Sequence, residues 1–404
     1  MRIIHTADWH LGRTLHAMPL ETYHARFLDH FVDLVDEEKP DAVIVAGDVF
    51  DRAVASTSAI AMCEDAFARL VDRTRLIVIP GNHDSAQRLG FGAQFHRDGL
   101  HVVWDERDCG RAIDLDGVRI YPIPYLEPDR ARYLLASPDH ATVEDDATDV
   151  SESALPRSHE AVMAAAMRRV DDDLAAHPRD LAIAVVHAFV TGSTTSDSER
   201  DISVGGAQQI PGTVFAHLGH QRRDDRRSHG VSYVACGHLH RPQTPYRDDE
   251  VSVRYSGSVM PLSFSEASDS KSSTIIDIEG RQLTTREIPT ESGLDLRVIA
   301  GTLDELTSAP PAWAPSAFVQ VSVTDALRPE RMVERIRRTY PHALVIRHTA
   351  AETDAAQPRR DVTALSRIEA TTAFFTQSLD RELTTDERRI IEDVWTTLRR
   401  GEEQ

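Results

Sequence analysis

The chain has 404 residues, of which 41% are hydrophobic and 27% charged. It is therefore long enough for two or three domains with cores of their own and lacks the profile of a disordered protein. Its formal net charge of −20 argues against a protein that coats nucleic acid with its whole surface, because phosphate binding needs clustered Lys and Arg, so any DNA contact must be local.

The N-terminus runs directly into a strand-like stretch. It has neither the basic segment nor the apolar core of a secretory signal. No stretch approaches 18 consecutive apolar residues. Cys63, Cys109 and Cys236 are far apart and odd in number, which favours neither a disulfide framework nor a zinc knuckle. We expect a cytoplasmic protein with reduced thiols and no membrane partner.

Apolar, β-branched runs alternate with helix-like segments through the first 285 residues. Helices are predicted at 21–38 and 55–71, and strands at 2–7, 41–47, 76–81, 118–125, 180–187, 231–238, 253–258 and 273–279. Polar loops are predicted at 140–156 and 219–230. This alternation predicts an α/β fold, either a sandwich flanked by helices or a doubly wound sheet.

The remainder of the chain has a different pattern. A strand at 317–323, a helix at 329–340 and a strand at 343–348 predict a small α+β domain. The predicted organisation is a first domain at 1–285, this small domain at 286–350, a linker at 351–362 and terminal helices at 363–404.

The terminal segment contains two predicted amphipathic helices. Apolar residues recur at three- and four-residue steps from Leu365 to Leu379, interrupted by Thr372. A second helix begins with the capping box of Thr384 and Glu387. These helices pack either on the rest of the chain or on a partner protein.

Residues of metal-ligand type follow, or end, each of the five strongest apolar runs. Aspartate, asparagine and histidine without cysteine suit manganese, iron or zinc and disfavour copper(I) or an iron–sulfur cluster. Seven ligands suffice for two ions that share a bridging carboxylate, as in sites that hydrolyse phosphate esters. The seven candidates are Asp8, His10, Asp48, Asn82, His187, His238 and His240.

Three further side chains lie close to these candidates in sequence. His83 follows Asn82 and is suited to binding the phosphate or protonating the leaving oxygen. Asp51 and Asp84 are candidates for orienting imidazoles, although a role on the loop surface is equally compatible with the sequence. Gly81 permits a sharp turn before Asn82.

The motifs DWH, GDVFD, GNHD, VVH and GHLH, taken together, resemble the five phosphoesterase motifs of the calcineurin-like metallophosphoesterase superfamily. HTADWHLGR, GHLHRPQ and YSGSVMPLSFSE, the last at 255–266, are similar to the SbcD family of nuclease subunits. The resemblance is strong over about 280 residues. The small domain and the terminal helices that follow match the family only in the order of their elements. The resemblance implies a β-sandwich flanked by helices, followed by a DNA-recognition cap at 286–350.

The resemblance also implies a function. It indicates an ATP-dependent 3′–5′ double-strand DNA exonuclease with single-strand and hairpin endonuclease activity, acting in DNA repair and recombination. The first manganese ion would bind Asp8, His10 and His240, the second would bind Asn82, His187 and His238, and Asp48 would bridge them. His83 would serve the phosphate and the leaving group.

The resemblance further indicates the partners. The sequence has no GxxxxGK[ST] loop, so ATP dependence requires another subunit. In the family this subunit is the SbcC-type ATPase, which the helices after 363 would bind, with a homodimer of nuclease subunits inside a heterotetramer acting on double-stranded DNA ends and hairpins.

Two other functions remain compatible with the residues. A small-molecule or cyclic-nucleotide phosphodiesterase would share every ligand, and a non-catalytic DNA-end scaffold would share the layout. The charged segment 217–230 is longer than the resemblance leads us to expect. It is either a solvent-exposed loop or an arginine contact to DNA.

Overall fold

The computed structural model describes residues 1–93, 99–136, 154–177, 181–199, 209–216, 230–349, 368–369, 371–372, 375 and 383–402. The chain divides into two compact units, Met1–Thr349 and Ala350–Gln404. No helix within the described ranges combines the length and the apolar character needed to cross a lipid bilayer.

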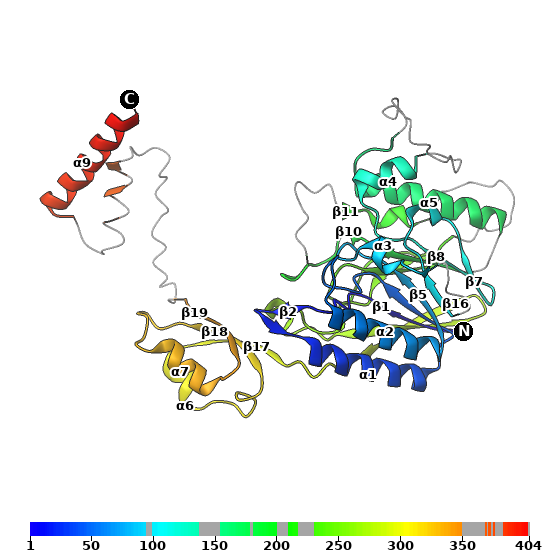
Figure 1. Ribbon diagram of the computed structural model, residues 1–404, viewed down its shortest axis with the longest axis horizontal. Helices are drawn as coiled ribbons and strands as arrows, with labels where there is room; N and C mark the ends of the chain where they lie inside the picture. Colours follow the sequence, from blue (N-terminus) through cyan, green and yellow to red (C-terminus); the bar gives the residue numbers. More distant parts are fainter. Residues whose placement is uncertain are drawn as a thin grey trace. The chain divides into compact units, whose positions relative to one another are not determined.

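Two six-stranded mixed sheets form the centre of the first unit (Figure 1). The first has the order β16-β15-β1-β4-β5-β6, in which the last four strands are parallel. Its strands are β1 (Arg2–Thr6), β4 (Ala42–Ala46), β5 (Arg75–Ile79), β6 (Leu100–Val102), β15 (Ser272–Glu279) and β16 (Gln282–Pro289).

The second sheet has the order β13-β14-β12-β9-β8-β7, with four parallel strands between two antiparallel edges. Its strands are β7 (Ile113–Leu115), β8 (Val118–Pro122), β9 (Ala182–His187), β12 (Tyr233–Gly237), β13 (Gln243–Arg247) and β14 (Ser252–Tyr255). The expected boundary of the first domain, at 285, falls inside β16 of the first sheet.

Alternating side chains of the central strands build three apolar layers. In β4, Ile44 joins the core between the two sheets, whereas Val43 and Val45 join the core beneath the helices α1 (Glu21–Glu38) and α2 (Thr57–Val71). On the far side of the second sheet, α4 (Pro128–Leu134) and α5 (His159–Ala176) cover a third core. Figure 1 shows the helix pairs on opposite faces, so the fold is the helix-flanked sandwich and not a single doubly wound sheet.

Local sequence explains the helix boundaries. α1 spans the predicted residues and ends where Lys39 adopts a left-handed conformation, with φ 47°. α5 is absent from the predicted elements, although Ser158 caps it by accepting a hydrogen bond from the Ala161 amide at 3.2 Å. Its many alanines make its apolar stripe weak in the sequence.

A three-stranded parallel sheet follows the sandwich. It contains β17 (Leu296–Gly301), β18 (Phe318–Val323) and β19 (Ala343–His348), with α6 (Leu303–Ser308) and α7 (Met332–Thr339) as its helices. The predicted strand, helix and strand are confirmed, and β17 and α6 complete the region. Short elements elsewhere are β2 (Thr14–Leu15), β3 (Met18–Pro19), α3 (Ala86–Leu89), β10 (Phe189–Val190), β11 (Gln209–Ile210), and the 3₁₀ turns η2 (Glu106–Asp108), η3 (Gly212–Val214) and η4 (Phe264–Glu266).

The second unit contains the helix α9 (Thr385–Glu402). Its predicted capping box is present, because the Thr384 amide donates to Glu387 at 2.8 Å and the Glu387 amide donates to the Thr384 hydroxyl at 3.3 Å. Most of the other predicted terminal helix, the linker 351–362, most of the polar loop 140–156 and nearly all of the charged segment 217–230 lie outside the described residues.

Candidate metal centre

The seven predicted ligands lie at one edge of the sandwich. Asp8 and His10 follow β1, Asp48 follows β4, and Asn82 follows β5, all in the first sheet. From the second sheet, His187 ends β9, and His238 and His240 follow β12. Because these strands are parallel within each sheet, their carboxyl ends meet. The amide of His238 donates to the Asp8 carboxylate at 3.0 Å, which joins the two sheets there.

One half of the cluster surrounds His10. The ligand-type atoms of Asp8, His10 and His240 all lie within 4.8 Å of one another. Nε2 of His10 is 3.1 Å from Nε2 of His240 and 3.6 Å from Oδ2 of Asp48. All four residues are buried, so their polar atoms face one another and not solvent.

The other half surrounds Asn82. Its Oδ1 lies 2.9 Å from Nε2 of His187 and 2.9 Å from Nδ1 of His238. Oδ2 of Asp48 is 3.4 Å from Nε2 of His187. The same oxygen of Asp48 therefore stands between His10 in one half and His187 in the other.

This donor set fits a pair of divalent cations. Two buried carboxylates and several imidazole nitrogens converge without a buried Lys or Arg among them, and buried charges are normally paired or bound to metal. Oxygen and nitrogen donors without thiolate suit hard or borderline ions. The site is accordingly a His/Asp metal centre, and its residues could share two ions through Asp48.

Backbone strain is concentrated at the same residues. Asp8, His10, Asp48 and His238 have φ values of 53°, 47°, 49° and 105°, in the region that favours glycine. Each such residue costs about 1–3 kcal/mol and persists only where its surroundings enforce it. This pattern is typical of a functional site.

Three glycines leave room for the cluster. A Cβ on Gly47 would lie 2.3 Å from Nδ1 of His187, and one on Gly237 would lie 1.9 Å from the Ala46 carbonyl oxygen. A Cβ on Gly81 would lie 2.2 Å from the Asp48 carboxylate. The chain bends at residues 82–84, directly after Gly81. The φ of Gly81 is outside the left-handed region, so glycine is required there for space.

Burial sets the protonation of the imidazoles. It lowers the pKa of His10 well below the usual range and that of His238 to about 3, so both rings are neutral at pH 7. Burial by itself raises the pKa of Asp48, but the nearby His187, His10 and His83 outweigh it and hold the pKa well below its usual value. His10 and His238 thus present neutral imidazoles beside the ionised Asp48 carboxylate.

Hydrogen bonds fix individual rings. Nδ1 of His187 donates to the Ala46 carbonyl at 2.9 Å, which turns Nε2 toward the cluster. Burial by itself lowers the pKa of His187, but the Asp48 and Asp8 carboxylates outweigh it and raise the pKa to about 9. Nδ1 of His83 donates to the Asp51 carbonyl at 2.8 Å, and the His83 amide donates to Asp48 at 2.8 Å. His83 is only partly buried, with its ring edge against that of His10 at 4.8 Å between centroids.

The two predicted accessory carboxylates have different surroundings. Oδ1 of Asp51 lies 3.7 Å from Nδ1 of His10 and 2.9 Å from the Arg13 guanidinium, a position that can orient His10. Asp84 instead accepts backbone amides of Gly81, Val49 and Phe50 at 2.9–3.1 Å. Its hydrogen bonds therefore join the loops after β4 and β5.

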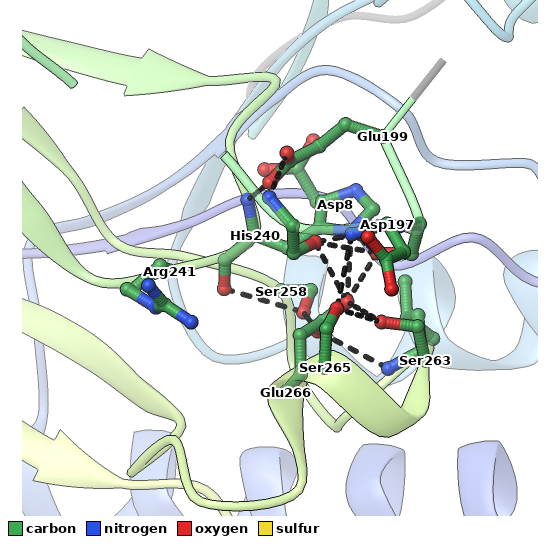
Figure 2. A network of polar contacts seen from close by, with 12 residues as sticks. Asp8, Asp197, Glu199, His240, Arg241, Ser258, Ser263, Ser265 and Glu266 are labelled. Atoms are coloured by element: carbon green, nitrogen blue, oxygen red, sulfur yellow. Dashed lines mark hydrogen bonds and ion pairs between the residues drawn. The ribbon is translucent and has the colours of Figure 1, made fainter. Parts of the chain in front are cut away.

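The sequence analysis missed a set of polar side chains around His240. Oγ of Ser198 lies 2.5 Å from Nδ1 of His240. Glu266 lies 3.6 Å from the same nitrogen, and Glu199 accepts the His240 amide at 2.8 Å (Figure 2). The one signal in the sequence was the stretch YSGSVMPLSFSE, which ends at Glu266. Ser198 and Glu199 carry no comparable signal.

Two family models match the sequence. Residues 1–242 match the calcineurin-like phosphoesterase family, and residues 293–378 match the SbcD C-terminal region, described as the type 5 capsule protein repressor C-terminal domain. The first match covers more than half of the chain and includes all seven candidate ligands.

Two solved structures resemble this chain only weakly. The crystal structure of TT1561 of Thermus thermophilus is 14% identical with a TM-score of 0.38, covering 71% of this chain and 98% of its own. The Pseudomonas putida nuclease MPE is 22% identical with a TM-score of 0.20, covering 30% of this chain and 52% of its own. Both TM-scores are low, so the family models carry the comparison.

Proposed function

Because the chain belongs to the calcineurin-like phosphoesterase family, we propose that this metallophosphoesterase is a metal-dependent DNA nuclease of the SbcD type. One observation carries the proposal: seven Asp, Asn and His side chains from five strand ends converge around Asp48. The SbcD C-terminal match beyond the phosphoesterase region favours a nuclease over other members of the family.

The halves of the cluster suggest how the ions are held. Asp8, His10 and His240 would bind one ion, Asn82, His187 and His238 would bind the other, and Asp48 would bridge them. Manganese is the metal we propose, because the carboxylate and amide oxygens suit it and the SbcD resemblance implies it. Iron and zinc suit the imidazole nitrogens equally well.

The remaining residues suggest how the phosphodiester is cleaved. Two bound divalent ions supply an activated water nucleophile at neutral pH and stabilise negative charge on the phosphate. His83 keeps Nδ1 bonded to the Asp51 carbonyl, so its Nε2 is available to the substrate. From this position it would bind a phosphate oxygen or protonate the leaving oxygen. Its partial exposure suits contact with substrate better than burial as a ligand.

The activities and partners follow from the SbcD match. We propose ATP-dependent 3′–5′ exonuclease activity on double-stranded DNA, endonuclease activity on hairpins and single strands, and a homodimer joined to an SbcC-type ATPase. On α9, Ile390 and Val394 are 62% and 51% exposed, which supports this helix as part of the ATPase-binding surface. The segment 286–350 would contact DNA as a cap.

The experiment compares substrates and one conservative variant. The purified chain with manganese is given linear duplex DNA, hairpin DNA, bis-p-nitrophenyl phosphate and cyclic AMP, with and without the ATPase and ATP. Asp48→Asn keeps the side-chain shape and should lose nuclease activity and manganese binding by titration calorimetry. Asp116→Asn is the matched control, because Asp116 has the same φ of 49° but is exposed.

The outcomes separate the possible functions. Degradation of DNA ends that Asp48→Asn abolishes and Asp116→Asn retains supports the nuclease. Hydrolysis of cyclic AMP alone would replace it with a small-molecule phosphodiesterase. DNA binding without hydrolysis of any substrate would indicate a non-catalytic scaffold.

A further inference from the structure

A group of buried polar side chains surrounds His240 on the side away from His10 and is centred on a carboxylate (Figure 2). Its centre is Glu266, a carboxylate with 0% exposed surface that belongs to none of the candidate metal ligands. Glu266 ends the turn η4 and the stretch YSGSVMPLSFSE, for which the proposed chemistry gives no role. A buried carboxylate in such a place needs hydrogen bonds and a balancing charge from its neighbours.

Donors surround the Glu266 carboxylate. Lys271, also buried, donates to Oε2 at 2.6 Å and balances the charge. The hydroxyls of Ser196 and Ser263 donate to Oε1 at 2.9 and 3.0 Å, and that of Ser198 also donates to it. A carboxylate paired with an ammonium group is ionised and can only accept, so each serine directs its proton toward it.

This arrangement fixes the His240 ring. Because the single Ser198 proton is directed to Glu266, the Ser198 oxygen must accept from Nδ1 of His240, 2.5 Å away. The proton then resides on Nδ1 and the lone pair on Nε2, which faces Nε2 of His10 at 3.1 Å. A neutral ring in this tautomer is the form that binds metal.

The backbone of the same residue is held by the same groups. Lys271 donates to the His240 carbonyl at 2.7 Å while it contacts Glu266, and Glu199 accepts the His240 amide at 2.8 Å. The amide of Asp197 donates to Ser265 of η4 at 3.0 Å. Residues 196–199 are therefore hydrogen-bonded on one side to η4 and on the other to the strand end that presents His240.

We propose that Glu266, acting through Ser198, is the positioning residue that sets the tautomer and orientation of His240 for metal binding. The inference rests on the proposed function, since it takes His240 as a ligand. The Ala46 carbonyl orients His187 in a comparable way, whereas the ring of His240 contacts a hydroxyl that is itself bonded to a carboxylate. Such outer partners typically contribute about 10- to 100-fold in metal affinity.

The test measures manganese binding site by site. Calorimetry and electron paramagnetic resonance give the affinity and number of ions for the full chain and for Ser198→Ala and Glu266→Gln. Each variant should weaken one ion about 10- to 100-fold and leave the other unchanged. The double variant should lose no more than the larger single effect, because both residues act along one path.

Controls separate positioning from structural damage. Ser273→Ala removes a hydroxyl of β15 that is also buried and has no hydrogen-bond partner within the described structure, and this variant should bind both ions normally. Loss of both ions together with a lower melting temperature in Ser198→Ala would overturn the inference in favour of a structural role. Unchanged affinity for both ions in Ser198→Ala would also overturn it.

His240→Ala distinguishes failure of this inference from failure of the proposed function. If it loses one ion while Ser198→Ala and Glu266→Gln retain both, the metal centre stands and the positioning role falls. If His240→Ala itself retains both ions at full affinity, the ligand assignment falls, and the positioning role with it.

Discussion

His5 is expected to make the folded protein sensitive to mild acid. Its ring is fully buried in β1, with Nδ1 3.1 Å from the Tyr233 hydroxyl and no hydrogen-bond partner at Nε2. Burial, and then the positive charge of Arg254, lower the pKa of His5 to about 3. Replacing His5 with Gln removes this titration and keeps a polar group near Tyr233.

The sign and the size of the pH effect on stability follow from the difference in proton binding between the folded and the unfolded chain. Between pH 3 and 6.5 the unfolded chain binds a proton at His5 that the folded chain does not, so the stability falls as the pH falls through 6.5. From pH 7 to pH 5 the loss from this one group is about 2 kcal/mol, given an unfolded pKa of about 6.5. His5→Gln should lose about that much less stability over the same interval.

The assay is urea unfolding of both proteins in EDTA at several values between pH 5 and 7, followed by circular dichroism. Other titrating groups cancel in the difference between the two pH profiles. His177→Gln, at a side chain that is 56% exposed, should follow the wild-type profile. Parallel profiles for the wild type and His5→Gln would refute the reasoning, because His5 would then titrate alike in both states.

Three other substitutions test packing around the centre. Trp9→Ala removes a fully buried ring that meets three phenylalanines edge-on, and should cost about 3–5 kcal/mol in urea unfolding, with Trp9→Phe costing less. Asp84→Ala strands three backbone amides, at about 1–3 kcal/mol each, and should weaken manganese binding in calorimetry, whereas unchanged binding would contradict its role in joining the loops. Gly237→Ala forces a Cβ onto the Ala46 carbonyl and should lower both the melting temperature and manganese affinity, unlike Gly301→Ala, whose Cβ has 3.3 Å to its nearest neighbour.

The sequence predicted the strands and the polar residues at their ends because both are local patterns. Alternation and β-branched runs located β1, β4, β5, β9 and β12 within a few residues. Once the strands of each sheet are parallel, the residues that follow them must gather at one edge. Trp9, which separates Asp8 from His10 in the sequence, is buried against Phe27 and Phe31.

What the sequence could not predict depends on contacts between distant segments. Gly47 is needed because β4 approaches His187 of β9 closely there, and Gly237 because β12 approaches β4. The local sequence patterns do not contain the distance between the two sheets. Ser198 and Glu266 are 68 residues apart, and nothing in a serine-rich loop specifies which hydroxyl will face His240. The weak stripe of α5 was missed for a different reason, since alanine packs well without marking a face.

The carboxylates of the candidate ligands Asp8 and Asp48 also accept backbone amides of neighbouring site residues, and this determines which variants can test the centre cleanly. The Asp8 carboxylate accepts the amide of His238, and the Asp48 carboxylate accepts the amide of His83. Asp8, Asp48 and His238 all have left-handed φ values that their surroundings must enforce. An alanine at Asp8 would thus free a second ligand on the opposite sheet as well as remove the first. Asn keeps an acceptor oxygen for that amide and tolerates the left-handed backbone, so loss of metal in Asp8→Asn reports on the carboxylate alone.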